Sequence, residues 1–137
     1  MMGEGFEHPE PTADWETSGY WEGAARGELV LQRCRDCGLV QHRPRAICAH
    51  CLSGSIDHFV ASGRGTVHTF TVIHQNQMRA FRGACPYVLA YVDLEEGPRL
   101  MTNIVDCDPA TVRIGQAVVP DFSPCKNGLA VPRFRPA

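Results

Sequence analysis

The second half of the chain contains short stretches in which apolar and polar residues alternate, the pattern of half-buried β-strands. The clearest stretch is 87–94 (YVLAYVDL). The turn sequence EEGP at 95–98 predicts that 99–105 (RLMTNIV) pairs back with it as a hairpin. Because successive side chains of a strand point to opposite faces, one face of 87–94 should point into the protein and the other outward. The inward face comprises Val88, Ala90, Val92 and Leu94, and the outward face Tyr87, Leu89 and Tyr91.

Three further strands are predicted after residue 60. The run 63–75 is β-branched and opened by glycines, while 117–122 (AVVPDF) and 129–134 (LAVPRF) are joined by a Lys-Asn-Gly turn. Residues 76–86 are predicted as a loop, and 109–113 as a helical turn. Five strands with short connections, one of which contains a helical turn, suit a small Greek-key barrel of the OB type. We therefore expect a mainly β protein in which residues 57–137 form a five-stranded OB-fold domain.

An aromatic segment lies near the start of the chain. In residues 14–27 the apolar side chains recur at roughly helical spacing, Asp14 or Ser18 could cap the start, and Gly27 is a stop signal. This helical segment could pack its tryptophans on the protein's own core, or it could form an arm that contacts a partner protein. Residues 1–13 are expected to be a flexible N-terminus. The apolar positions of the helical segment are Trp15, Tyr20, Trp21 and Ala24.

Between these regions, four cysteines form two Cys-x-x-Cys pairs with ten residues between the pairs. Predicted strands at 28–33 and 39–43 flank the first pair, and the whole ribbon is assigned to residues 28–56. This spacing is a strong signal for a tetrahedral metal site with a closed four-thiolate shell, so we expect a structural zinc ion. Iron is the rival ion, because the same thiolates serve rubredoxin-type electron transfer. The ligands are Cys34, Cys37, Cys48 and Cys51, while His42 and His50 are expected to be exposed loop residues.

The composition narrows the choice of function. The 137 residues are 44% hydrophobic and 20% charged with a net charge of −2, which is typical of a soluble globular protein. It is not the composition of a basic nucleic-acid binder or a polybasic membrane anchor. We find no signal peptide and no membrane-spanning apolar run, so we expect a reducing cytoplasm. There, paired Cys-x-x-Cys motifs favour metal over disulfides, and the odd total of seven cysteines agrees with this.

Two other function classes have weak support. An OB-type barrel could bind single-stranded nucleic acid, and the outward stripe of Tyr87, Leu89 and Tyr91 could stack bases, but it could equally contact a partner protein. The arginines of this half are scattered along the chain, which does not favour a charge-driven nucleic-acid binder. We find no catalytic motif and expect no catalytic residue. His68 and His74 are interpreted as polar barrel residues, and Cys85, Cys107 and Cys125 as small buried side chains.

The order of the motifs resembles one known family. YWEGAARGELVLQRC is followed by CRDCG and CAHC, then by SGRGTVHTFTV, PYVLAYVDLEEGPRLMTNIV and VRIGQAVVPDF. This set resembles the acyl-CoA-associated proteins that join a rubredoxin-like zinc ribbon to an OB fold, long classified as a domain of unknown function. The similarity covers about residues 15–135, nearly the whole chain. It implies that the four cysteines of the ribbon bind zinc.

The resemblance also implies a role in a complex. Members of this family are typically non-catalytic accessory subunits of thiolase-superfamily proteins, either thiolases or aldolases, which cleave or form carbon–carbon bonds in acyl-CoA thioesters during lipid or aromatic degradation. The partner carries the catalytic groups, and the accessory subunit stabilises it and helps to enclose the CoA thioester. A two-plus-two heterotetramer is implied, because thiolase-like partners are usually dimers.

Two sets of contact residues are hypotheses of our own. Arg79 and Arg82 lie in the loop 77–83, where they could meet the phosphates of CoA. The proposed partner interface combines both aromatic segments, because Trp and Tyr are enriched at interface hot spots. It comprises Trp15, Tyr20, Trp21, Tyr87, Leu89 and Tyr91.

Overall fold

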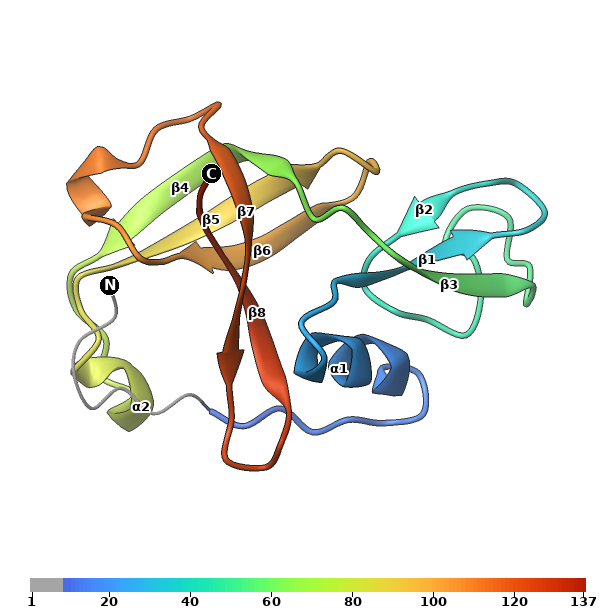
Figure 1. The fold of residues 1–137 in the computed structure, drawn as a ribbon, viewed down its shortest axis with the longest axis horizontal. Helices are drawn as coiled ribbons and strands as arrows, with labels where there is room; N and C mark the ends of the chain where they lie inside the picture. The colour runs from blue at the N-terminus through green and yellow to red at the C-terminus, as the bar shows by residue number, and fades with distance from the viewer. Residues whose placement is uncertain (1–8) are drawn as a thin grey trace.

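The computed structural model describes residues 9–137 and divides them between a small three-stranded sheet with a helix beside it and a closed five-stranded barrel (Figure 1). The small sheet has the order β2-β1-β3, and the barrel has the order β4-β5-β6-β8-β7. The predicted fold class, mainly β with an N-terminal helix, a ribbon and a five-stranded barrel, is therefore confirmed. Residues 1–8 of the segment predicted to be flexible lie outside the described residues.

Helix α1 (Ser18–Ala25) is shorter than the segment 14–27 that the sequence predicted. Residues 14–17 instead form a turn, in which Asp14 Oδ1 accepts hydrogen bonds from the backbone N–H groups of Glu16 and Thr17. The helix packs closely on the ribbon sheet at Gly23. A Cβ atom there would lie 2.3 Å from Val30 Cγ2, so only glycine permits this contact.

The ribbon sheet contains one strand more than the sequence predicted. It comprises β1 (Val30–Cys34), β2 (Val40–Gln41) and β3 (Ile56–Val60), and β3 pairs with β1 in continuous antiparallel register. The predicted boundary at residue 57 falls inside this strand, all of which pairs with the ribbon sheet. The physical reason is that 56–60 could form a strand in either sheet, and only its long-range pairing with β1 decides.

The barrel strands agree closely with the predicted ones. They are β4 (Gly65–Ile73), β5 (Tyr87–Leu94), β6 (Arg99–Ile104), β7 (Ala117–Pro124) and β8 (Ala130–Pro136). The loop predicted at 76–86 contains the four-residue helix α2 (Arg79–Arg82), and the predicted helical turn is the 3-10 helix η1 (Pro109–Thr111). Antiparallel pairing of β4 with β7 and parallel pairing of β6 with β8 close the barrel. None of the helices in residues 9–137 is long and apolar enough to cross a membrane.

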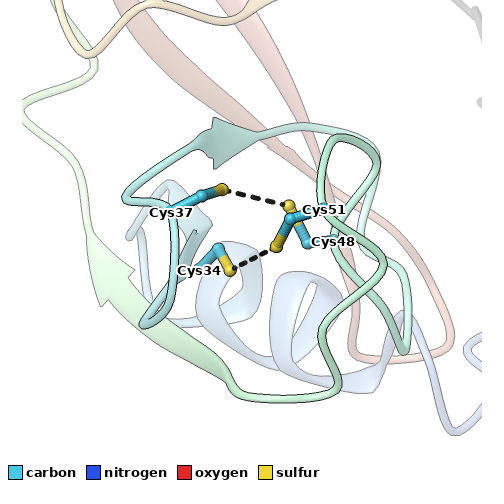
Figure 2. Close-up of side chains that lie close together, drawn as sticks. All are labelled: Cys34, Cys37, Cys48 and Cys51. Carbon is cyan, nitrogen blue, oxygen red and sulfur yellow. Dashed lines mark hydrogen bonds between the residues drawn. The ribbon is translucent and has the colours of Figure 1, made fainter.

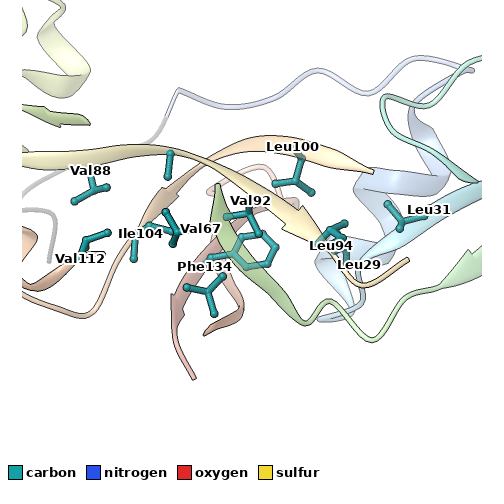
Figure 3. Packing of buried hydrophobic residues seen from close by; sticks show 12 residues of the cluster. Leu29, Leu31, Val67, Val88, Val92, Leu94, Leu100, Ile104, Val112 and Phe134 are labelled. Carbon is teal, nitrogen blue, oxygen red and sulfur yellow. The ribbon is translucent and has the colours of Figure 1, made fainter. Parts of the chain in front are cut away.

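The core runs without interruption from the barrel into the ribbon (Figure 3). The four inward positions predicted for β5 are all buried, at most 5% exposed. At one end of the barrel, Leu94 and Leu100 join the same buried cluster as Leu29 and Leu31, which lie at the start of the ribbon. The linker between the two parts is fixed as well, because Ser62 N–H donates to Glu96 Oε1 at 2.7 Å. Ribbon and barrel therefore share one hydrophobic core.

Candidate metal centre and contact surfaces

The four predicted metal ligands converge at the tip of the ribbon (Figure 2). Their sulfur atoms lie within 4.8 Å of one another, and the Cys34–Cys51 and Cys37–Cys48 sulfur pairs are 3.5 Å apart. Four thiolates around zinc at Zn–S distances of about 2.3 Å would be separated by about 3.8 Å, so the group fits a tetrahedral ion. It is the one group of three or more potential ligands that could hold a metal among residues 9–137.

Each cysteine pair lies on a tight turn of the same design. In the first turn the N–H of Gly38 donates to Cys34 O at 3.0 Å, and in the second the N–H of Leu52 donates to Cys48 O at 3.1 Å. Gly38 and Leu52 are both left-handed, with φ of 78° and 64°. Glycine adopts this conformation freely, whereas leucine does so at a cost of about 1–2 kcal/mol. The second turn therefore keeps the shape of the first although its sequence lacks the glycine.

Backbone N–H groups prepare two of the thiols to bind a cation. The N–H of Cys37 lowers the pKa of Cys34, and the N–H groups of Cys51 and His50 lower the pKa of Cys48 to about 6. The His50 nitrogen lies 3.3 Å from Cys48 Sγ. Because the thiolate is the form that binds metal, these hydrogen bonds favour the charged state that zinc requires.

A buried pair of glutamines, which the sequence analysis did not identify, supports the second cysteine turn. Gln32 and Gln41 are 2% and 6% exposed and face each other in the β1–β2 register. Gln32 exchanges two hydrogen bonds with the backbone of Arg45, each 2.9 Å long. Gln41 accepts from Ala49 N–H at 2.9 Å and donates to Ile47 O at 3.2 Å. The one feature of the sequence that could have indicated this pair is a glutamine directly after the apolar Leu31, and it is a weak signal.

The two ribbon histidines differ from each other. His50 is exposed as predicted, but His42 is half-buried, so that part of the prediction is wrong. The His42 ring packs on Tyr20 with ring centroids 5.2 Å apart, and its burial lowers the pKa of His42 to about 4. Helix α1 covers this side of the ribbon, a contact between segments far apart in sequence that residue spacing could not reveal.

The aromatic residues predicted for a partner interface lie in different environments. Trp15 is 78% exposed, whereas Tyr20 and Trp21 are half-buried and pack edge to face, with ring centroids 4.9 Å apart. Tyr20 also packs against the shared core. Tyr20 therefore packs on the protein's own core, as the first of the two alternatives for this segment predicted. Trp15 is exposed, as the second alternative, an arm that contacts a partner, requires.

The outward stripe of β5 is shorter than predicted. Tyr87 is only 9% exposed, so the expectation that it forms part of an exposed stripe is wrong. Residues of the 76–86 connection fold over it, and Asn76 Nδ2 donates to its hydroxyl at 2.8 Å while the Phe81 ring lies 5.7 Å away. Tyr91 is 45% exposed and pairs in register with Met101 on β6, which is 52% exposed. Leu89 is half-buried.

The polar candidates lie on the surface of the barrel. Arg79 and Arg82 are exposed on α2, where Arg82 donates to Gln77 O at 3.2 Å. His68 Nδ1 lies 3.1 Å from Asp93, which also accepts from Arg99 Nε at 2.5 Å. The hydrogen bond from Arg99 foremost, with a smaller contribution from His68, holds the pKa of Asp93 below its usual range. We interpret this cluster as a solvent-exposed ion pair.

Comparisons with known proteins also find a ribbon followed by a barrel, and they divide the two within β3. Residues 21–57 match the model of the ChsH2 rubredoxin-like zinc ribbon domain, and residues 60–123 match that of the ChsH2 C-terminal OB-fold domain. A chain from the solved structure of the Ltp2-ChsH2(DUF35) aldolase is 38% identical with a TM-score of 0.82, covering 93% of this chain and 98% of that one.

Three curated relatives differ in their names. A probable enoyl-CoA hydratase alpha subunit of Thermomonospora curvata is 39% identical over 94% of this chain, which spans only 40% of that protein. A DUF35 domain-containing scaffold protein of Methanothermobacter thermautotrophicus is 39% identical over 68% of this chain and 70% of its own length. Benzoylsuccinyl-CoA thiolase subunit BbsA of Geobacter metallireducens is 33% identical over 53% of this chain and 47% of its own.

Proposed function

The chain belongs to the ChsH2 family of zinc-ribbon and OB-fold proteins, and from this we propose that it is a non-catalytic accessory subunit of an acyl-CoA enzyme complex. The partner is a thiolase-superfamily protein, a thiolase or an aldolase, that cleaves or forms a carbon–carbon bond in an acyl-CoA thioester. The observation that carries this proposal is the likeness to the chain of the Ltp2-ChsH2(DUF35) aldolase over 93% of the residues.

The chemistry of the described residues is consistent with an accessory role. A shell of four thiolates leaves no open position at which zinc could activate water or polarise a carbonyl. The metal instead closes a module of about 30 residues that cannot bury enough apolar surface to fold alone. Zinc thus serves as a structural cofactor, and the CoA thioester is a ligand shared with the partner.

A second candidate follows from the hydratase relative. Because this chain aligns with 40% of a probable enoyl-CoA hydratase alpha subunit, a related ribbon and barrel also occur within a larger acyl-CoA hydratase subunit. In that case the partner would be a hydratase, and the reaction would add water to a carbon–carbon double bond. Both candidates place the chain beside an enzyme that acts on acyl-CoA, and they differ in the reaction of the partner.

Co-expression of the tagged chain with thiolase-superfamily and hydratase-type proteins of its source organism tests the proposal. We expect a thiolase-superfamily protein to co-purify as a two-plus-two complex, measured by light scattering. The complex should cleave acyl-CoA, and the chain alone should be inactive. Acyl-CoA turnover by the chain alone, or exclusive capture of a hydratase, would refute it. A red colour would reveal four-thiolate iron and an electron carrier, whereas salt-dependent binding of a single-stranded oligonucleotide would favour the nucleic-acid alternative.

A further inference from the structure

The ribbon sheet has one free edge of useful length. In the sheet order β2-β1-β3 both outer strands are edges, but β2 has only two residues, whereas β3 runs for five in continuous register with β1. The barrel is closed, with β4 and β7 paired over two residues and β6 and β8 over one. Native proteins commonly protect an edge strand with Lys, Pro or a bulge, and β3 (IDHFV) has none of these.

The hydrogen bonds on either side of β3 identify the backbone groups that are free. Arg35 N–H donates to Ser55 O and Ala61 N–H to Leu29 O, so alternate residues of β3, namely Asp57 and Phe59, face β1. The N–H and C=O groups of His58 and Val60 consequently point away from β1. No other strand in residues 9–137 pairs with them.

A groove of about 230 Å³ lies beside this edge, between β3 and helix α1. Its lining includes Val30, Phe59 and Val60, and Val60 is 58% exposed. The groove is larger than the roughly 150 Å³ cavity that is known to hold benzene in another protein, so it can accept a large apolar side chain.

The charges of the groove restrict the occupant further. Glu22 and Arg26 of the α1 region contribute to its lining together with His58. Arg26 is already paired with Glu28 at 3.1 Å, whereas Glu22 forms no ion pair with residues 9–137. A ligand of the groove would therefore complement it best with a basic group near Glu22.

We infer that β3 is a docking strand: an extended segment of the partner subunit pairs with its free edge, places an apolar side chain beside Val60 and a Lys or Arg beside Glu22. This inference rests on the proposed function, since it takes the same partner. Backbone pairing provides affinity, and the groove selects the side chain, as in other cases of strand addition.

Amide hydrogen exchange, resolved by residue in the free chain and in the co-purified complex, tests the inference directly. In the free chain the amides of Asp57 and Phe59 should be protected and those of His58 and Val60 should exchange fast. In the complex the latter two should slow by at least tenfold. A complex in which they exchange at the free rate would overturn the inference and leave the proposed function intact. If no acyl-CoA enzyme binds, both are overturned.

Two variants provide an independent measurement. Val60→Pro removes an outward N–H but no bond to β1, and we expect it to weaken partner binding at least tenfold. Val60→Thr keeps the N–H and is the matched control. Glu22→Arg should weaken binding and Glu22→Gln less so. Equal binding by Val60→Pro and Val60→Thr, with both chains folded and loaded with zinc, would count against the inference. Protection of His58 that rises with the concentration of the free chain would assign the edge to a second copy instead.

Discussion

Gln41 Nε2 donates a hydrogen bond to Gln32 Oε1 at 2.8 Å, across two strands that meet beside the metal centre. Other hydrogen bonds of this pair reach backbone atoms of Arg45, Ile47 and Ala49, just before and within the second cysteine turn. Hydrogen bonds within the chain, as well as the metal, therefore shape the loop that carries Cys48 and Cys51.

Gln41→Ala should weaken the metal centre without removing a ligand. The substitution removes the side-chain partner of Ala49 N–H and of Ile47 O, while Gln32 Oε1 still accepts from Arg45 N–H. Each group left unsatisfied costs about 1–3 kcal/mol. We expect a lower melting temperature and faster zinc loss to a chelator, with about one zinc per chain when saturated. Gln75→Ala, at an exposed position, is the control. Unchanged chelator resistance in Gln41→Ala would contradict this role.

Cys34→Ser or Cys48→Ser should yield insoluble or unfolded protein. Each opens the four-thiolate shell, and metal binding supplies on the order of 10 kcal/mol to the folding of such ribbons. Cys125→Ser, outside the group of four, should keep about one zinc per chain by metal analysis. Well-folded wild-type protein with neither zinc nor iron would contradict the prediction that the ribbon needs a metal to fold.

The two tryptophans should respond differently to truncation. Trp15 is 78% exposed, so Trp15→Ala should leave the melting temperature unchanged while it weakens partner binding by about thirtyfold, the effect of losing a hot-spot side chain of about 2 kcal/mol. Trp21 packs on Tyr20, so Trp21→Ala should lower the melting temperature of the isolated chain. If Trp15→Ala binds the partner like the wild type, the N-terminal segment is not part of the interface.

Arg79→Gln with Arg82→Gln should raise KM for acyl-CoA in the complex by about tenfold, equivalent to about 1.4 kcal/mol, with kcat unchanged. Both guanidinium groups are exposed on α2, where they could meet phosphate oxygens. A pantetheine thioester, which lacks the nucleotide phosphates, should show no difference between variant and wild type. Arg135→Gln, also exposed, controls for general loss of positive charge. Equal KM values for acyl-CoA would exclude the contact.

Tyr20 should make the protein sensitive to alkali. Burial raises the pKa of Tyr20 to about 12 from 10.0, so the unfolded chain loses this proton at lower pH than the native one. The free energy of unfolding should therefore fall as pH rises from about 10 to 12, in total by about 2–3 kcal/mol. Tyr20→Phe should remove this part of the pH dependence in chemical denaturation, and Tyr91→Phe should not. An identical pH dependence in Tyr20→Phe would contradict the raised pKa of Tyr20.

The strands of the barrel could be predicted because alternation and turn signals are local properties. The inward positions of 87–94 are correct for this reason, and so are the hairpins at 95–98 and 126–128. The errors concern contacts between distant segments. The pairing of 56–60 with β1 and the burial of Tyr87 beneath the 76–86 connection both depend on such contacts.

The metal site shows the same contrast between local sequence patterns, which can be predicted, and contacts between distant segments, which cannot. The four cysteines were predicted together because their spacing is itself the signal. Gln32 and Gln41 were missed because single buried glutamines have no characteristic spacing, and the burial of His42 was missed because helix α1 contacts it from a distant position. The contact residues proposed for CoA and for the partner stay predictions.

The core shared by Leu29, Leu31, Leu94 and Leu100 has a consequence for recombination between relatives. A cut at the linker 61–64 would separate the ribbon sheet from the barrel, yet it would expose leucines on both fragments. Grafting this barrel onto another ribbon would therefore succeed only where the incoming ribbon supplies matching leucines at these positions. The leucine contacts between ribbon and barrel, and not the limits of these two parts in sequence, therefore define the smallest unit that can be inherited or transplanted intact.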